Sequence, residues 1–590
     1  MNSKGLQTRG IYVLIATIFF SLFGFVSLLY AETADLVIKN GKVITVDEDF
    51  SIHQAIAVKG NKIVAVGSNE QIDKYIGRKT KVLDLKGKTL LPGINDAHAH
   101  LSSWGLTRPP LSLDLGFPAV KSIADIATAI EKKASQIKPG EWIQGRGWDE
   151  GYLEECKMAP GVRRPTRWDI DKASPLNPVF TTEYSGHASL VNSKALELAG
   201  ITKDTPDPVG GIIVRDPKTG EPTGLLMEKA RALVLKVIPP WTAVQQKQGI
   251  VTGMKEMNSL GITSVTDPGI MPEYVGIYTD VYNDGKFTVR MNVLLYFPII
   301  KGVTQGVDDW EAAFKYVQTR GGFGNEWLRI AGVKIHGGIP PLKTAWMYEP
   351  YVGGGVGSLV IRGETDDEKV KQFKDMILLA HKNRYQVGIH CCGDKEIDLA
   401  METFAKAMKE DPWDARHYII HSDFATPKAC KLAGDYNLGM NVQSSIKWTI
   451  SDFMETIVGK TRGDYMWPLR TMLDAGIRVT NSSDAAVTYP NWLFGVAGAV
   501  LRESKATGKV SGPEQRITVA EAIRTYTING AYQDHQEDIK GSIEAGKLAD
   551  FCIIDRNILS IDPHHIRNTK VLMTIVDGKI VYDASKGLFE

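Results

Sequence analysis

The middle of the chain alternates short apolar strands with helical stretches, and this alternation restricts the possible folds more than any other feature. The sequence predicts helices at 371–383, 398–408 and 468–476 from their 3.6-residue periodicity. Such alternation indicates parallel strands joined by crossover helices, and a TIM-like (β/α)8 barrel of α/β class is the leading prediction. The predicted strands lie at 261–267, 328–336, 386–394, 417–423, 439–445 and 476–484.

Both ends of the chain are predicted to be β structure. Residues 34–68 contain two stretches of alternating apolar residues, each around an Asn/Gly hairpin signal, and residues 571–583 repeat the pattern around Asp-Gly. Because two β-rich ends flank a long middle, we expect residues 34–92 and 541–590 to form one composite β-sandwich domain.

The barrel is expected to occupy residues 93–540. Residues from about 105 to 250 fit its strand–helix rhythm poorly, because they are rich in Gly, Pro and aromatic residues. We therefore expect an inserted subdomain there, beside the mouth of the barrel. A total of 590 residues is too long for one ordinary core, but a barrel with such additions accounts for most of it.

Composition excludes several classes of protein. The net charge of +1 gives no sign of a nucleic-acid partner. The 5 cysteines are an odd, sparse set without a C-x-x-C pair, which excludes a disulfide framework and a zinc ribbon. The sequence leaves open whether the chain forms an oligomer.

The N-terminus has the pattern of a targeting segment. Lys4 and Arg9 precede an uncharged run at 11–30, and Ala31 follows it. This favours a signal peptide at 1–31 and an exported, periplasmic or extracellular protein. A run of about 20 apolar residues is also long enough to span a bilayer, so a retained anchor in the cytoplasmic membrane is the alternative.

Two histidines follow the first apolar strand of the barrel, in the stretch LLPGINDAHAHL at 90–101. In an extended chain, alternate side chains share a face, so the Cβ atoms of His98 and His100 would lie roughly 6–7 Å apart. That spacing suits two ligands of one metal ion. The alternative is two polar residues at a strand end, one bonded to a carbonyl group and one in water.

Further polar side chains stand near the carboxyl ends of the later strands. In a barrel these ends meet at one mouth, where catalytic residues gather, so we expect all of them close to the histidine pair. One such residue alone is commonly structural, whereas several at successive strand ends indicate a catalytic site. They are Lys334, His390, His421 and Asp484.

These residue types suit metal-assisted hydrolysis. Neutral imidazoles are ligands for zinc and similar divalent ions, and a bound ion makes hydroxide available at neutral pH. Asp484 is the candidate general acid/base, which would take the proton of water and pass it to a leaving nitrogen. Lys334 suits a metal site only if it is modified, because an ammonium repels a cation whereas a lysine carbamate is an anionic ligand.

Several of these motifs together resemble the metal-dependent amidohydrolase superfamily. They are LLPGINDAHAH, the lysine strand, GIHCCGD, IIHSD, SSDA and GSIEAGKLADF. The stretches at 165–196 and 261–269 are similar to its YtcJ-like branch, which includes N-substituted formamide deformylases. The resemblance covers nearly everything after residue 34. It implies a TIM-like barrel with a composite β-sandwich, one or two divalent metal ions, most simply zinc, and a small-molecule substrate.

The resemblance also implies roles for the strand-end residues. His98 and His100 would bind the more buried metal, and His390 and His421 the second. Lys334 would be a carboxylated bridging ligand, and Asp484 both a ligand and the general acid/base.

The sequence departs from the family pattern at two positions. Gly338 stands where many relatives have an acidic residue, and Ile420 stands where they often have Glu. His336 shares a strand face with Lys334 and is either an extra ligand, a substrate contact or a wall residue.

Other residues of the inserted region and its approach are candidates for substrate contact. Trp104, Trp148 and His187 have aromatic or polar side chains suited to a pocket wall, although the tryptophans could equally be core.

The sequence thus predicts a metal-dependent hydrolase that cleaves non-peptide carbon–nitrogen bonds (amide, formamide or cyclic amide) by attack of a metal-activated water. A lactone or ester hydrolase on the same scaffold is the first alternative. An exported, non-catalytic binding protein is the second, and metal content together with turnover of model amides would separate these readings.

Overall fold

The computed structural model describes residues 33–589, except 159–162, 185, 209, 298–304 and 317–319. The predicted targeting segment at 1–31 lies outside the described residues. No helix in the described part of the chain is long and apolar enough to cross a membrane.

Eight parallel strands form the centre of the molecule, and each pairs with the next in chain order. This confirms the barrel prediction. A short strand, β17 (Phe323–Gly324), pairs with β18 from outside this order. The eight strands are β8 (Ile94–Asp96), β15 (Ile262–Ile270), β16 (Arg290–Leu295), β18 (Leu328–Ile335), β19 (Gln386–Cys391), β20 (Tyr418–His421), β21 (Gly439–Val442) and β22 (Thr480–Asn481).

Hydrogen bonds beyond the ends of the first and last strands bring the barrel close to closure. Ser483, just after β22, donates from its N–H and its hydroxyl to the carboxylate of Asp96, at 3.1 and 2.6 Å. The N–H of Asp484 donates to the carbonyl oxygen of His98 at 2.9 Å. The segments that carry these residues are therefore held together by the seam of the barrel.

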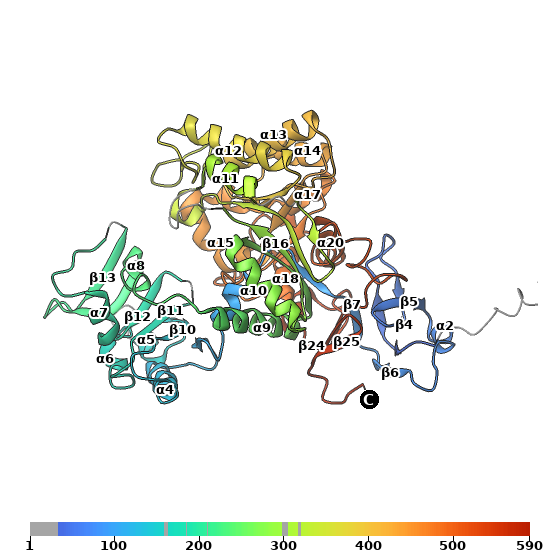
Figure 1. Ribbon diagram of the computed structural model, residues 1–590, viewed down its shortest axis with the longest axis horizontal. Coiled ribbons are helices and arrows are strands. Elements are labelled where there is room, and N and C mark those ends of the chain that lie inside the picture. Colours follow the sequence, from blue (N-terminus) through green and yellow to red (C-terminus); the bar gives the residue numbers. More distant parts are fainter. Residues whose placement is uncertain are drawn as a thin grey trace, which may run out of the picture.

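Helices connect the strands and cover the outside of the barrel (Figure 1). The predicted helices correspond to α12, α13 and α17; the prediction extends one residue past the end of α12 and one to two residues past the ends of α17. In α12, Thr365 caps the N-terminus in a capping box with Glu368, and Phe373, Met376 and Ile377 face the core. The larger barrel helices are α9 (Ala243–Ser259), α10 (Pro272–Asn283), α11 (Val307–Tyr316), α12 (Asp366–Lys382), α13 (Asp394–Glu410), α14 (Pro427–Asp435), α15 (Ser444–Val458), α17 (Leu469–Asp474), α18 (Trp492–Leu501), α19 (Val519–Thr525) and α20 (Ile528–Gln533).

Two further sheets join the ends of the chain, as the sequence predicted. β7 (Thr89–Pro92) pairs antiparallel with β23 (Phe551–Ile554), so that segments far apart in sequence are neighbours in one sheet. Buried residues of both sheets share one core, which includes Ile38, Leu90 and Ile553. One sheet holds β1 (Leu36–Lys39), β4 (Ala55–Lys59), β5 (Lys62–Gly67) and β6 (Lys81–Asp84), and the other holds β2 (Lys42–Ile44), β3 (Ile52–His53), β7, β23, β24 (Val571–Val576) and β25 (Lys579–Asp583).

The inserted region forms a sheet of its own, drawn at the left of the barrel in Figure 1. One core packs α4 (Ile123–Ala134) on this sheet, and a second core includes α7 (Ser193–Ala199). The following helix, α9, belongs to the barrel, because it leads into β15 and packs on α3 (Leu101–Leu106). The strands are β9 (Leu113–Asp114), β10 (Ile143–Trp148), β11 (Val179–Glu183), β12 (Ala188–Val191), β13 (Gly211–Arg215) and β14 (Pro222–Glu228).

A buried carboxylate ties the C-terminal part of the chain to the strands of the barrel. Asp534, at the end of α20, accepts hydrogen bonds from Asn95 of β8 at 2.8 Å, Thr266 of β15 at 3.0 Å and Asn292 of β16 at 3.0 Å. It also pairs with the ammonium of Lys540 at 2.8 Å. Because a buried charge needs such partners, this cluster fixes residues 528–540 against three neighbouring strands.

Candidate metal centre

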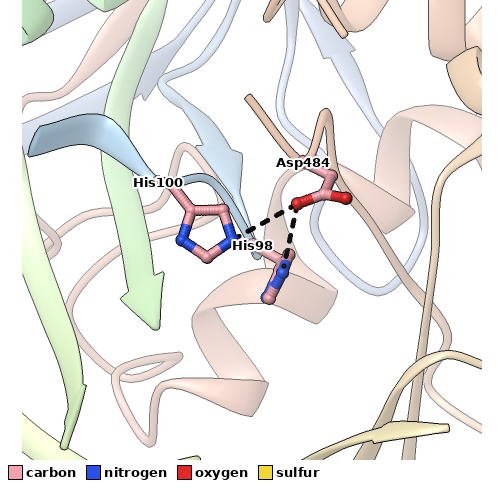
Figure 2. Close-up of side chains that lie close together, drawn as sticks. All are labelled: His98, His100 and Asp484. Carbon is pink, nitrogen blue, oxygen red and sulfur yellow. Dashed lines mark ion pairs between the residues drawn. The ribbon is translucent and has the colours of Figure 1, made fainter. Parts of the chain in front are cut away.

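His98, His100 and Asp484 meet at the seam between the first and last strands (Figure 2). The Nε2 atoms of His98 and His100 lie 3.4 and 3.5 Å from Oδ1 of Asp484, and the three ligand atoms all lie within 4.8 Å of one another. β8 ends at Asp96, so the two histidines do not continue a regular strand as predicted. Their rings nevertheless come together, with centroids 5.3 Å apart.

The backbone of Asp484 is held in an unusual conformation. Its φ of 51° lies in the left-handed region, which side chains other than those of Gly, Asn and Asp seldom adopt. Two backbone hydrogen bonds, to the carbonyl of His98 at 2.9 Å and from the N–H of Val487 at 2.6 Å, maintain it. This turn, in a conformation that Asp tolerates, therefore directs the carboxylate toward the histidine pair.

His421 ends β20, and Gln443 fixes the orientation of its ring. Oε1 of Gln443 lies 2.8 Å from Nδ1 of His421, while Nε2 of Gln443 donates to Asn441 at 2.7 Å and to Ser482 at 3.0 Å. Since the amide nitrogen is used by those acceptors, its oxygen accepts the Nδ1 proton of His421. Nε2 of His421 is thereby left with its lone pair available for a metal.

His390 lies beside His421, and their ring centroids are 4.1 Å apart. The ring centroid of His98 lies 5.5 Å from that of His421. Nε2 of His390 donates to the carbonyl oxygen of Gly338 at 3.1 Å, so Nδ1 is its free nitrogen. Burial lowers the pKa of His390 well below its usual value, and the charges of His421 and Lys334 lower it further. Both rings are thus neutral, as metal ligands must be.

Gly338 has a steric reason to lack the acidic side chain expected at its position. A Cβ atom there would lie 2.4 Å from the backbone carbonyl of Thr344 and 2.5 Å from the N of Ala345. The close approach of these backbones places the Gly338 carbonyl against His390. The departure from the family pattern therefore contributes to the site instead of removing part of it.

Lys334 lies near the end of β18 and is almost fully buried, with 2% of its surface exposed. Burial lowers the pKa of its ammonium to about 7, against an opposing effect of Asp484. Among the described residues, no group accepts a hydrogen bond from its Nζ. Carboxylation of this buried lysine stays a prediction.

His336 has an exposed ring at the mouth. Its centroid lies 5.7 Å from that of His390 and 5.5 Å from that of Tyr296. The surrounding protein lowers the pKa of the imidazole, and the charge of Lys334 lowers it further. It is not a buried wall residue, and a role as ligand or substrate contact stays a prediction.

The structure corrects the expectation of substrate contact for two tryptophans. Trp148 is 1% exposed in the core beneath α4, and its Nε1 donates to the hydroxyl of Thr181 at 3.2 Å. Trp104 is 3% exposed in the barrel core. A buried ring cannot line an open pocket. His187 lies on the inserted region in an ion pair with Glu228 at 2.9 Å, and contact with a substrate stays a prediction for it.

Two residues that support the site were missed from the sequence. Gln443 follows β21, one of two predicted strands to whose carboxyl ends no residue was assigned, and that gap in the pattern was the available signal. Asp96 accepts from both Ser483 donors and from the N–H of His98 at 3.4 Å, so it joins the histidine loop to the Asp484 loop. Burial raises the pKa of Asp96 to about 7.

The geometry agrees with comparisons to known proteins. The model of the amidohydrolase family matches residues 81–582. The chain belongs to this family. It is therefore an enzyme, a hydrolase of carbon–nitrogen bonds, and the resemblance predicted from its motifs is confirmed.

Two relatives and one solved structure illustrate the match. The chain is 29% identical to the putative amidohydrolase YtcJ of Bacillus subtilis (strain 168), over 92% of this chain and 99% of the relative. It is also 29% identical to the N-substituted formamide deformylase of Arthrobacter pascens, over 94% and 99%. The crystal structure of an uncharacterized metal-dependent hydrolase from Pyrococcus horikoshii superposes with a TM-score of 0.69 at 22% identity, over 90% of this chain and 99% of that one.

Proposed function

We propose that this amidohydrolase uses one or two divalent metal ions, most simply zinc, to hydrolyse amide, formamide or cyclic amide bonds of small molecules. The observation that carries the proposal is the meeting of His98, His100 and Asp484 within 4.8 Å at the mouth of the barrel. The similarity to a formamide deformylase over 94% of the chain supports the substrate class.

The side chains present fit such ions. His98 and His100 would hold one ion together with Asp484, and His390 and His421 would hold the other through Nδ1 and Nε2, the nitrogens that their hydrogen bonds leave free. Imidazole nitrogens with one carboxylate are typical zinc ligands. Nδ1 of His98 is buried without a partner among the described residues, which is a further polar atom that the surroundings leave unsatisfied.

Lys334 would join the two halves of the site as a carboxylated lysine. Its amine is buried among the histidines and has no acceptor in the described part of the chain. Adding a carboxyl group to Nζ replaces a positive charge by a negative one and supplies two oxygens. That change removes the repulsion between an ammonium and a divalent cation.

A divalent ion bound here would lower the pKa of its bound water to about 7 and would polarise a carbonyl group. Asp484, whose Oδ1 lies near Nε2 of both His98 and His100, would take the proton of the attacking water. The same carboxyl group then gives the proton to the leaving nitrogen. Gln443 and the Gly338 carbonyl keep the imidazoles of His421 and His390 oriented throughout.

The test combines metal content with a panel of substrates. Full-length protein, stripped with a chelator and reloaded with zinc, is offered formamides, amides, cyclic amides, lactones and esters. We expect metal-dependent hydrolysis of the nitrogen compounds, and a loss of about 10²–10⁴-fold in kcat for Asp484→Asn. Asp474→Asn, at an exposed carboxylate paired with Arg470, is the matched control and keeps its rate. Faster hydrolysis of lactones or esters, or full activity without metal, would refute the proposal.

A further inference from the structure

Two arginine side chains of the inserted region lie close enough together for the charge of one to act on the other. Arg146 stands on β10, and Arg231 ends the short helix η1 (Lys229–Arg231). Both reach the same turn: Arg231 donates through Nη1 to the carbonyl of Gly186, and a Cβ built on Gly186 would lie 3.8 Å from Nη2 of Arg146. Neither forms an ion pair with a carboxylate of any described residue. Both side chains are half-buried.

Two nearby carboxylates act on this pair without an ion pair to either guanidinium. Glu228, which is bonded to Nδ1 of His187 at 2.9 and 3.1 Å, and Glu183 both act on Arg231, and Glu183 also acts on Arg146. Burial lowers the pKa of both guanidinium groups, and for Arg146 the charges of Arg108 and Arg231 lower it further. The pair is therefore partly removed from water, and its positive charges are only partly offset, because neither guanidinium has an ion-pair partner among the described residues.

Among the residues that the structure describes, most of the N–H donors of this pair find no acceptor. Arg146 makes one long hydrogen bond, from Nη2 to the carbonyl of Tyr184 at 3.4 Å. Arg231 uses Nε for the hydroxyl of Ser189 at 2.8 Å, in addition to its bond to Gly186. A guanidinium offers five N–H groups in a planar fork, so both side chains retain donors for an oxyanion. Carboxylate and phosphate groups match that fork.

The position of the pair also suits a ligand. β9, β10 and β11 are parallel, and Arg146 and Tyr184 stand near the carboxyl ends of β10 and β11, where ligands of such sheets bind. Arg146 is in register with Asp114 of β9, which Arg108 approaches at 3.4 Å. Arg108 follows α3, the helix that begins directly after His100. The pair thus lies on the side of the inserted region that adjoins the mouth of the barrel.

We propose that Arg146 and Arg231 form an anion-binding site that takes a carboxylate or phosphate group. This site is independent of the metal centre and of the proposed reaction, because none of its residues belongs to the metal cluster. The oxyanion belongs either to a substrate that extends from the mouth or to a free anion in solution.

Binding to metal-free, full-length protein tests the site directly. Inorganic phosphate and malonate are titrated calorimetrically into the wild type, Arg146→Gln, Arg231→Gln and the control Arg167→Gln, whose guanidinium already pairs with Glu221 at 3.4 Å. We expect the wild type and the control to bind alike and the two variants to bind at least about tenfold more weakly. Arg146→Lys, which keeps the charge but loses the fork, should weaken binding by an intermediate factor.

Two results would overturn the proposal: a wild type that binds neither anion, or variants that bind both anions as the wild type does. Because Arg231 also holds the turn at Gly186, the thermal unfolding midpoint of each variant is measured alongside. Arg146→Gln removes only one long hydrogen bond and keeps the test valid if Arg231→Gln fails to fold.

Kinetics with phosphate present identifies the source of the oxyanion, whichever substrate of the panel is turned over. A rise in KM for anionic substrates only, absent in Arg146→Gln, assigns the site to the substrate. Unchanged KM values together with retained phosphate binding assign it to a free anion. Both results support the site itself, and failure of the metal-dependent hydrolysis would affect neither binding experiment.

Discussion

Replacing Gln443 by Met should weaken metal binding, although Gln443 touches no metal. The change keeps the length of the side chain and removes its hydrogen bonds to His421, Asn441 and Ser482. Nδ1–H of His421 is then buried without an acceptor, and the tautomer with a free Nε2 is no longer favoured. Loss of such a partner typically lowers metal affinity by about 10–100-fold, which is about 1.4–2.8 kcal/mol.

The free energy of unfolding should fall as well. Ser482 keeps its own bond to Asn441 at 3.0 Å, so only the His421 donor is left wholly unsatisfied. Three lost hydrogen bonds of about 0.5–1.5 kcal/mol each, in a side chain with no exposed surface, give a loss of about 2–4 kcal/mol. Urea unfolding of the metal-free protein measures this effect separately from binding.

Zinc affinity is measured by competition with a chelating dye, and Gln515→Met is the matched control. Gln515 is also a buried glutamine, and its oxygen accepts from the N–H and hydroxyl of Thr471 at 3.1 and 3.2 Å, away from the cluster. The control should lose stability and keep its zinc affinity. The reasoning fails if Gln443→Met binds zinc as tightly as the wild type, or if Gln515→Met loses affinity to the same degree.

Four further outcomes are expected. Lys334→Ala should lose metal and nearly all turnover, with partial recovery of both in a short carboxylic acid and bicarbonate; retained metal content would discard the bridging role. Gly338→Ala should lower the free energy of unfolding by about 1–3 kcal/mol in urea, because its Cβ would lie 2.4 Å from the Thr344 backbone. Burial holds the pKa of His417 well below 6.5, so the imidazole takes up a proton near pH 6.5 only in the unfolded chain. The free energy of unfolding should therefore be highest above about pH 6.5 and fall as pH decreases, and it should fall less in His417→Gln. Equal pH slopes for the two proteins would contradict this. Protein from the native host should begin near Glu32 by N-terminal sequencing if the segment before it is a cleaved signal peptide, and a full-length chain in the membrane would favour the anchor.

The strands and their polar ends were predictable because both depend on local pattern. An apolar run such as that ending in His390 can satisfy its backbone only within a sheet, and parallel strands bring their carboxyl ends to one mouth. His98 and His100 were placed correctly beside Asp484 even though β8 ends two residues before them. Their meeting depends on the order of strands in the barrel more than on regular strand geometry.

The supporting residues were not predictable, because their roles arise from tertiary contacts. Gln443 orients His421 from the next strand, and no sequence spacing connects the two. Trp148 was predicted to contact substrate but is buried in the core, because an aromatic residue near glycines has the same local sequence pattern in a core as in a pocket wall. Gly338 looked like a missing acid, and only the approach of the Thr344 backbone explains it.

The pairing of β7 with β23 has a consequence for how the protein is made. Cys552 leaves the ribosome about 460 residues after its partner Leu91, which is roughly 25–90 s at 5–20 residues per second. During that time Leu90 and Leu91, fully buried in the finished sheet, stand at an unpaired apolar edge next to the loop of His98 and His100. Asp534 has not yet been synthesised either, so β8, β15 and β16 lack the carboxylate that accepts hydrogen bonds from all three strands. His98 and His100 are thus synthesised early, but the sheet and strands around them are completed only when synthesis is nearly finished. During this interval the nascent chain is most prone to aggregation.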